Sequence, residues 1–373
     1  MERQDNLLIA QYRGSLPRVQ KRVSYMVLYG WFYLLLTCFL SGCSSDNHAV
    51  NTDPRLVSKF AVSGVYPRAL AWSPDGKEIA VGMGNSPSVR LFSFPNGQQI
   101  ASFGDYPVDT NGLAWSPNGQ YLAGAILNPS NTLQVWNPVT TKSLVLTSAG
   151  SGGLGLAWSP DSKFLAVMSE GKRDAKNPTP NGGVALYETA SWTQTFSMPT
   201  TSIITGAAWS PDGKRLAFAA NTPRADNSDS TVLLLLDIAD NHIEQIGEAQ
   251  DGFSTIVSWA SSGNLIAFEL NTLDTKPGEV LIADITKKTL IQRIRGDLTV
   301  NTLSWSPLEE RIAVAGFSRN MQVWEARTGR LVESYYHDST TSDDIFQVSW
   351  SPDGRFIASL VSDNTLWFWH APK

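Results

Sequence analysis

Trp72-Ser-Pro-Asp-Gly76 is the stretch that decides the fold, because it recurs along the whole chain. Its seven copies lie 43 to 51 residues apart and begin at Trp72, Trp115, Trp158, Trp209, Trp259, Trp305 and Trp350. The copies at Trp259 and Trp305 are divergent and read Trp-Ala-Ser-Ser-Gly and Trp-Ser-Pro-Leu-Glu. Seven copies at this period predict a repeat architecture rather than unrelated domains.

Each repeat has the pattern of four β-strands. Mostly apolar residues lead into the Trp, and the following Ser-Pro-Asp-Gly favours a turn because Pro presets φ and Gly accepts a positive φ. A second strand such as Glu78-Ile-Ala-Val81 and a third such as Leu133-Gln-Val-Trp136 follow. A polar turn such as Pro95-Asn-Gly97 then leads to a fourth strand. Four strands in 40 to 50 residues are typical of a propeller blade. The predicted fold is an all-β, seven-bladed β-propeller of four-stranded antiparallel blades.

The two ends of the repeat region indicate how the ring closes. The last repeat has only three predicted strands before Lys373, while an additional strand, Leu56–Val62, precedes the first repeat. We expect this N-terminal strand to pair with Leu366–Trp369 and complete the last blade. The pairing would cover an edge that is otherwise exposed to non-native strand addition.

The repeats resemble the WD40 superfamily of seven-bladed propellers over about residues 55–370, and their turns are also similar to blades of the periplasmic propeller of the Tol–Pal system. Trp-Asp and Gly-His dipeptides are missing, and Val135-Trp136-Asn137 comes close to the first. Only Ser362-Asp363-Asn364 resembles the usual Asp turn. These departures imply that the polar His–Asp network of typical blades is absent and that apolar packing alone stabilises the blades. The resemblance implies a docking platform for proteins.

The N-terminal segment has the features of an export signal. Arg13, Arg18, Lys21 and Arg22 precede Val23–Leu40, an apolar run without charge. Basic residues stay in the cytoplasm, so the chain that follows the run is exported. Leu40-Ser-Gly-Cys43 resembles the lipobox of a bacterial lipoprotein.

This resemblance implies three segments and a location. Residues 1–42 would be a signal peptide, 43–54 a tether acylated at Cys43, and 55–373 the propeller. The alternative is an uncleaved transmembrane anchor, because 18 apolar residues can just span a bilayer. Both interpretations place the propeller outside the cytoplasm, attached to the outer face of the cell membrane or within the periplasm.

Composition argues against several classes of function. The chain has 29 basic and 34 acidic residues and a formal net charge of -5, so we expect no basic face and no nucleic-acid partner. Two Cys and four His leave little material for a metal centre, and we predict neither metal nor cofactor. The repeated tryptophans are best interpreted as core residues rather than an aromatic ligand cage, because they serve every blade alike.

Catalytic candidates are poor. No Gly-x-Ser-x-Gly or His-Glu-x-x-His motif is present. His337 is followed by Asp338, Ser339, Asp343 and Asp344. This cluster is interpreted as a solvated polar loop in preference to a Ser–His–Asp triad or a calcium site. We therefore predict that the protein is not an enzyme.

Loop lengths indicate a binding surface. The connections between second and third strands are long only in three consecutive blades, at residues 169–183, 221–230 and 271–278. They share one face of a propeller with the connections between blades, and insertions on one face often mark binding, although exposed loops also lengthen by drift. The predicted partner-binding residues are Tyr66, Tyr106, Lys172, Arg173, Lys176, Arg224, Asp226, Asp229, Phe253, Asp274 and Lys276.

Two classes of function remain open from the sequence. The first is a non-catalytic scaffold that binds a protein or peptide. The alternative is a propeller enzyme, or a binder of small ligands or carbohydrates, with its site at the channel mouth. A polar cluster at the axis with perturbed titratable groups would favour the alternative.

Overall fold

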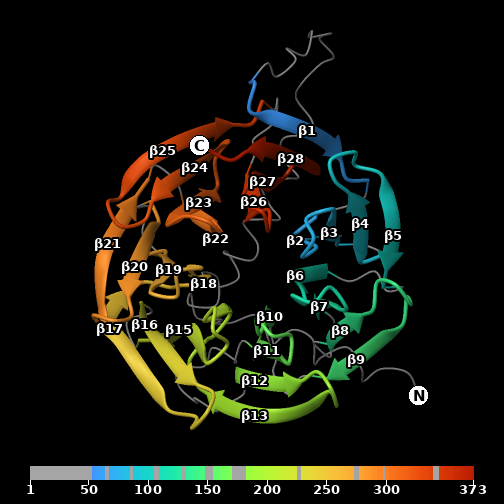
Figure 1. Ribbon diagram of the computed structural model, residues 1–373. Coiled ribbons are helices and arrows are strands. Elements are labelled where there is room, and N and C mark those ends of the chain that lie inside the picture. The colour runs from blue at the N-terminus through green and yellow to red at the C-terminus, as the bar shows by residue number, and fades with distance from the viewer. Residues whose placement is uncertain are drawn as a thin grey trace, which may run out of the picture. The chain divides into compact units, whose positions relative to one another are not determined.

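The computed structural model contains a compact unit, Asn51–Lys373, that forms a closed ring of strands (Figure 1). The structure describes residues 53–63, 67–84, 87–104, 109–127, 132–147, 154–169, 182–224, 228–272, 277–296, 299–338 and 344–373. The expected signal peptide and most of the expected tether lie outside these ranges. All of the regular secondary-structure elements in these ranges are β-strands. The described part of the chain contains no helix that is long and apolar enough to cross a membrane.

Seven four-stranded antiparallel sheets make up the ring, which confirms the predicted fold. In blades 1 to 6 the strands follow chain order from the channel outward. Blade 1 holds β2 (Ala69–Trp72), β3 (Glu78–Gly82), β4 (Val89–Ser93) and β5 (Gln99–Phe103). Blade 2 holds β6 (Asp109–Trp115), β7 (Leu122–Leu127), β8 (Thr132–Trp136) and β9 (Ser143–Thr147). Blade 3 holds β10 (Leu154–Trp158), β11 (Phe164–Ser169), β12 (Gly182–Glu188) and β13 (Thr193–Thr200).

The second half of the ring repeats the same order. Blade 4 holds β14 (Ala207–Trp209), β15 (Arg215–Pro223), β16 (Asp229–Asp237) and β17 (Ile243–Asp251). Blade 5 holds β18 (Val257–Trp259), β19 (Leu265–Leu270), β20 (Glu279–Asp284) and β21 (Thr289–Arg295). Blade 6 holds β22 (Val300–Trp305), β23 (Arg311–Gly316), β24 (Asn320–Glu325) and β25 (Arg330–Tyr336). Blade 7 holds β26 (Ile345–Trp350), β27 (Phe356–Val361), β28 (Thr365–His370) and β1 (Leu56–Ala61).

The N-terminal strand closes the ring, as the sequence predicts. β1 pairs antiparallel with β28, with Ala61 opposite Thr365. The Phe60 ring lies 5.5 Å from that of Phe368 and 5.5 Å from that of Phe92, which belongs to blade 1. β1 therefore joins the last blade to the first through both its backbone and a shared aromatic cluster.

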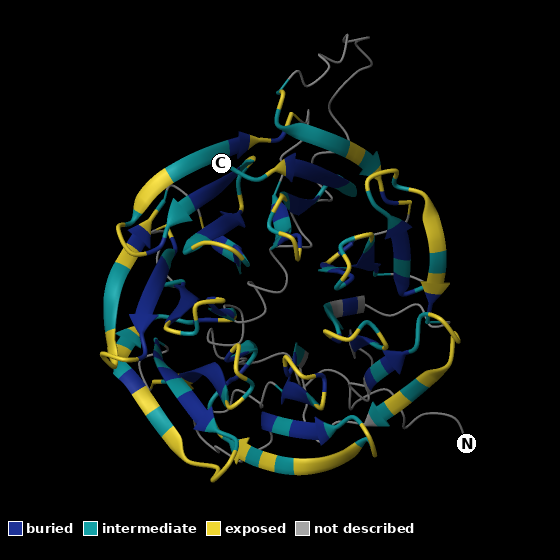
Figure 2. Cartoon of the chain, in the orientation of Figure 1, coloured by how far each residue is buried: buried dark blue, intermediate teal, exposed yellow. Residues whose placement is uncertain are grey.

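The apolar core consists of seven clusters, each between two consecutive blades. Figure 2 shows this arrangement, with buried residues on the inner strands and exposed residues along the outermost strands. The second strands are almost continuously buried because blades cover both of their faces; β19, for example, is buried at every position. No single blade can bury its own faces, so stability depends on the complete ring.

Most repeated tryptophans are core residues, as expected, and several also bond neighbouring blades. Six of the seven are 7–8% exposed, and Trp115 is half-buried. The indole N–H of Trp209 donates to the carbonyl of Ala157 in the preceding blade at 2.9 Å. Trp72, Trp158 and Trp305 make the corresponding bond. At these four positions the residue that fills the core therefore also bonds the inner strand of the preceding blade.

The Ser-Pro-Asp-Gly turns have the predicted geometry. Asp75 Oδ1 accepts hydrogen bonds from the Lys77 amide and from the Ser73 hydroxyl, while Gly76 takes a φ of 68°. In blade 3 a serine stands where five of the other six turns have glycine, and Ser162 adopts a φ of 61°. Its hydroxyl accepts a hydrogen bond from the Asn118 amide of blade 2 at 3.0 Å. Local turn chemistry therefore also contributes contacts between blades.

The expectation that apolar packing alone stabilises the blades is wrong. Buried polar side chains bond backbone groups of blades 4 and 6 and of the connection into blade 5, and they centre on Asn221, Glu269 and His337. All three lie within two residues of the end of a strand. A buried backbone N–H or C=O needs a partner, and these side chains supply one where no ladder can.

Candidate functional site

The ring has two different faces. We name the connection face as the one that carries the blade-to-blade connections and the connections between second and third strands. The turn face carries the Ser-Pro-Asp-Gly turns and the turns between third and fourth strands. The long connections that the sequence analysis singles out belong to the connection face of blades 3, 4 and 5.

Most of the predicted partner-binding residues lie outside the described ranges. These are Tyr66, Tyr106, Lys172, Arg173, Lys176, Asp226, Asp274 and Lys276. The lipidation candidate Cys43 also lies outside them. The roles assigned to these residues stay predictions. The structure describes the remaining three predicted partner-binding residues, Arg224, Asp229 and Phe253.

In blade 4 the connection is shorter than predicted because the hairpin continues. Residues assigned to a loop at 221–230 pair across β15 and β16, with Pro223 opposite Asp229. Arg224 is exposed and its guanidinium lies 2.7 Å from the Asp251 carboxylate. Asp229 is only 4% exposed, so this side chain is not available for the direct partner contact that we predicted. Of Arg224 and Asp229, only Arg224 is exposed on the connection face.

Phe253 belongs to the connection from blade 4 to blade 5. Its backbone N–H and C=O both bond to Asn271, at 2.8 and 2.9 Å, and its side chain is half-buried. The structure therefore gives Phe253 a role in fixing this connection. Contact with a partner through its ring stays a prediction.

The Asn221 side chain joins the connections on both sides of blade 4. Its Nδ2 donates to the carbonyls of Ile203 and Ser254 at 3.0 and 2.7 Å. Its Oδ1 accepts from the Thr231 hydroxyl at 2.7 Å and from the Ser254 amide at 2.8 Å. Both donor hydrogens and both acceptor lone pairs are used, and Asn221 is fully buried. This arrangement holds the bases of two connections in a fixed relation.

A second buried group, the Glu269 carboxyl of β19, holds the connection between blades 4 and 5. Its Oε1 accepts hydrogen bonds from the Thr255 amide and, at 2.5 Å, from the Thr255 hydroxyl. Its Oε2 accepts from the Ile256 amide at 2.7 Å and from the Ser254 hydroxyl at 3.2 Å. Desolvation raises the pKa of Glu269 to about 7, and the hydrogen bonds from Thr255 and Ile256 oppose this shift.

An enzyme or ligand site at the channel mouth would need a polar cluster at the axis with perturbed titratable groups, and Glu269 meets only the second requirement. It has a perturbed pKa, but it is fully buried and four donors already occupy its two oxygens. A general acid or base must reach its substrate within hydrogen-bond distance. The arrangement therefore fits a residue that positions the connection rather than one that acts on a substrate.

An exposed cluster that the sequence analysis missed lies on the connection face of blade 6. We name it the blade 6 corner and define it as Phe317, Arg319, Tyr336 and Asp338, all of them exposed. Phe317 and Tyr336 are 56% and 62% exposed, and they are the two aromatic residues among the large exposed apolar side chains of the described ranges. Phe317 and Arg319 lie in the β23–β24 turn, and Tyr336 ends the adjacent strand β25.

The imidazole of His337 fixes the blade 6 corner from beneath. His337 is 3% exposed, so the interpretation of its surroundings as a solvated loop is wrong for this residue. Its backbone N–H and its Nδ1 lie 2.9 and 3.0 Å from the Arg319 carbonyl. Because a carbonyl only accepts, Nδ1 carries the proton. Nε2 lies 2.7 Å from the Ser359 hydroxyl, which in turn accepts from the Trp369 indole at 3.4 Å.

The ring contacts of His337 explain why this geometry is rigid. The imidazole lies edge-on to the rings of Trp367 and Trp369, with centroids 5.2 and 5.4 Å away. Ser359, whose hydroxyl lies beside Nε2, is fully buried. The pair therefore supports the corner and does not form an accessible nucleophile.

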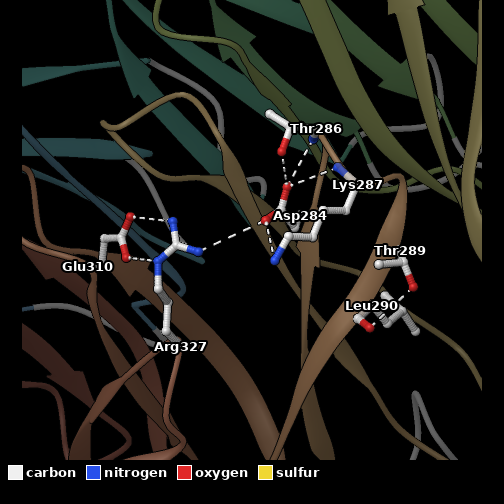
Figure 3. A network of polar contacts seen from close by, with 7 residues as sticks. All are labelled: Asp284, Thr286, Lys287, Thr289, Leu290, Glu310 and Arg327. Atoms are coloured by element: carbon white, nitrogen blue, oxygen red, sulfur yellow. Dashed lines mark hydrogen bonds and ion pairs between the residues drawn. The ribbon is translucent and has the colours of Figure 1, made fainter.

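On the turn face, a polar network joins blades 5 and 6 (Figure 3). Asp284 Oδ1 accepts from the Thr286 hydroxyl and amide and from the Lys287 amide, at 2.6 to 3.1 Å. Arg327 pairs with Glu310 and lies 3.9 Å from Asp284 Oδ2. Hydrogen bonds from Thr286 lower the pKa of Asp284 despite its burial. Within the described ranges no group of three or more His, Cys, Asp or Glu side chains has the geometry of a metal site.

Fold and connections together define a seven-bladed propeller of the WD-repeat type. The family model described as "Eukaryotic translation initiation factor eIF2A" matches residues 55–173 and 207–371, more than half of the chain. The chain therefore belongs to this family.

Two further comparisons agree with this architecture. WD repeat-containing protein AAC3 of Dictyostelium discoideum is 34% identical over 71 residues, which span 19% of this chain and 14% of that protein. A chain in the crystal structure of the mitotic checkpoint complex superposes with a TM-score of 0.66 at 18% identity, covering 90% of this chain and 100% of its own length. At that identity the likeness shows the fold alone.

Proposed function

We propose that this protein is a non-catalytic scaffold, anchored by lipid outside the cytoplasm, that binds a protein partner on its connection face. The observation that carries the proposal is the blade 6 corner. Its two exposed aromatic residues and its Arg are residue types enriched in protein interfaces. The buried His337 bonds already hold their backbone in place, so little ordering cost remains for binding.

The clamps in blades 4 and 5 support the same surface. Asn221 and Glu269 fix the bases of connections beside the blades that carry long insertions. The structurally similar chain comes from the mitotic checkpoint complex, and we extend membership of a complex to this chain as part of the proposal.

A pull-down with a matched control tests the scaffold. The full chain in detergent, tagged at its C-terminus, is compared with the double variant Phe317→Ala, Tyr336→Ala after cross-linking in native membranes. The control variant is Val139→Ala, Leu308→Ala, which removes apolar groups that are 88% and 70% exposed on the turn face. We expect the corner variant to lose at least tenfold in recovered partner and the control to retain it. Equal recovery with both variants would refute the corner as the docking surface.

The lipid anchor is the second part of the proposal. The apolar run Val23–Leu40 and the Leu40-Ser-Gly-Cys43 motif support it. Cys43→Ala is expected to abolish incorporation of labelled fatty acid and to leave the precursor unprocessed. Normal processing of this variant would show that Cys43 is not acylated.

The family description names translation initiation, which gives a second candidate function. This candidate needs a cytoplasmic chain, whereas the leader predicts export. Cell fractionation decides between the two. Recovery of the chain with ribosomes in the cytoplasmic fraction would favour the second candidate and contradict the anchored scaffold.

A further inference from the structure

The position of Glu269 is unusual when the seven blades are superposed by register. It lies three residues after Ile266, which pairs with the blade's repeated Trp259. The corresponding position in the other blades holds Gly82, Ala125, Met168, Ala219, Ala315 and Leu360. A propeller blade therefore needs no carboxyl here, and blade 5 has placed one in a fully buried site.

The surroundings of Glu269 can satisfy a neutral carboxylic acid. The Ser254 hydroxyl can accept the acid proton from Oε2, because it also lies 3.4 Å from the Ile256 carbonyl, to which it donates in turn. The backbone amides of Thr255 and Ile256 donate to oxygens that keep an acceptor lone pair in the neutral acid. The neutral form therefore closes every bond without placing a charge in the core.

The geometry points to Glu269 as a pH-dependent latch on the Gly252–Ile256 connection, which is closed while the carboxyl is neutral and released when it ionises. Nothing but this carboxyl accepts the amides of Thr255 and Ile256 among the hydrogen bonds of the described residues. The connection also packs closely on blade 4, where a Cβ on Gly206 would lie 2.3 Å from the Thr255 carbonyl oxygen. Release would therefore move the connection at the mouth of the channel.

The direction of the pH dependence follows from the linkage between protonation of Glu269 and closure of the connection. Burial raises the pKa of Glu269 to about 7 in the closed form, against 4.5 for a solvated carboxyl. A group that binds its proton more tightly in the closed form favours that form at low pH and loses the preference as pH rises through both values. Closure is therefore strongest below about pH 5 and weakest above pH 7.

Among the described residues, no charged neighbour reverses the rise in the pKa of Glu269. β18 and β22 carry no ionisable side chain, and β19 carries only Glu269 itself. Glu279 of β20 is paired with Arg293 and Arg295. In blade 4, Asp251 is paired with Arg224. Desolvation is the largest cause of the shift, and no Coulombic partner contributes to it.

Amide hydrogen exchange on the full chain in detergent tests the latch directly. Protection factors, which correct for the intrinsic effect of pH, are measured for the Thr255 and Ile256 amides from pH 5 to pH 8. With an ordinary carboxyl in the released form, protection is expected to fall about tenfold between pH 6 and pH 8. The Ser116 amide of blade 2, which donates to the Tyr121 carbonyl, is the internal reference and should not change.

Two variants separate the latch from a merely structural role. Glu269→Gln cannot titrate, so its protection factors should be independent of pH whatever their level. Glu248→Gln removes an exposed carboxyl from β17 and should keep the wild-type pH profile. Constant protection in the wild type, or the same pH profile in Glu269→Gln, would overturn the proposal.

The latch rests on the proposed function only for its consequence, which is weaker partner binding at alkaline pH. Exchange is measured without a partner, so a failed pull-down leaves the latch standing. A constant exchange profile in turn would leave the scaffold standing. The two proposals can therefore fail separately.

Discussion

The repeated indole nitrogens differ in what they bond, although their rings occupy equivalent places. Trp209 donates to the Ala157 carbonyl at 2.9 Å, whereas the indole nitrogen of Trp350 is buried without a hydrogen-bond partner. Both side chains are 7% exposed, so their apolar contributions are comparable. The difference between the two positions therefore isolates the hydrogen bond.

We expect Trp209→Phe to lower the free energy of unfolding by about 1 kcal/mol more than Trp350→Phe. The first change leaves the Ala157 carbonyl without its donor, whereas the second removes a donor that has no partner. Denaturant titration of the two variants measures the difference. Equal losses would show that the bond between blades contributes nothing to stability.

At the scale of the element, equivalent turns contribute differently according to their neighbours. Asp284 begins the third-to-fourth turn of blade 5 and accepts three hydrogen bonds from Thr286 and Lys287, with Arg327 of blade 6 nearby (Figure 3). Asp237 has the same place in blade 4 and accepts from the Ala239 amide. The turn of blade 5 is therefore coupled to its neighbour.

Asp284→Ala should lower the free energy of unfolding by about 1–2 kcal/mol at pH 7, and Asp237→Ala by less. The pKa of Asp284 is lowered in the folded state, mainly by the Thr286 hydrogen bond. Its contribution is therefore complete above pH 3.8, the unfolded value, and disappears as pH falls through the folded value. Urea titrations at pH 7 and pH 3 measure both effects. A difference that is undiminished at pH 3 would contradict the assignment to the ionised carboxylate.

At the scale of the whole molecule, stability depends on closure by β1. This strand supplies the outer edge of blade 7 and places Lys59 over the Trp367 ring at 4.3 Å. Arg55, just before it, pairs with Glu333 of blade 6 at 2.6 Å. Three consecutive blades therefore contact one segment, because Phe60 also reaches blade 1.

Deletion of residues 55–62 should lower Tm by about 10 °C or more and cause aggregation. The deletion exposes the backbone edge of β28 and opens the contact between blades 7 and 1. Thermal unfolding and light scattering measure these effects. As a control, Lys59→Ala removes one exposed contact and should shift Tm by only a few degrees. An unchanged melting curve after the deletion would refute closure by this strand.

The sequence by itself determined the number of blades, their strands and the closing pair, because these depend on local information. Ser-Pro-Asp-Gly specifies a turn from its own φ preferences and side-chain bonds, and alternating turns and apolar runs then specify strands. The surplus strand at Leu56–Val62 and the missing strand after β28 left one pairing to complete the ring. The relative lengths of the connections were also readable, although the blade 4 hairpin extends further than its composition indicated.

Only the tertiary structure decided the roles of Asn221, Glu269 and His337. Their bonding partners include Ser254, Thr255 and Ser359, which lie 33, 14 and 22 residues away along the chain. A polar residue within an apolar strand looks like an interruption in sequence, whereas in the folded ring it supplies the bonds that a connection lacks. The blade 6 corner was missed for the same reason, because Phe317 of the β23–β24 turn and Tyr336 of β25 reach the same face only when β24 pairs with β25. Local preference sets the blades, and contacts between distant segments set the surfaces they present.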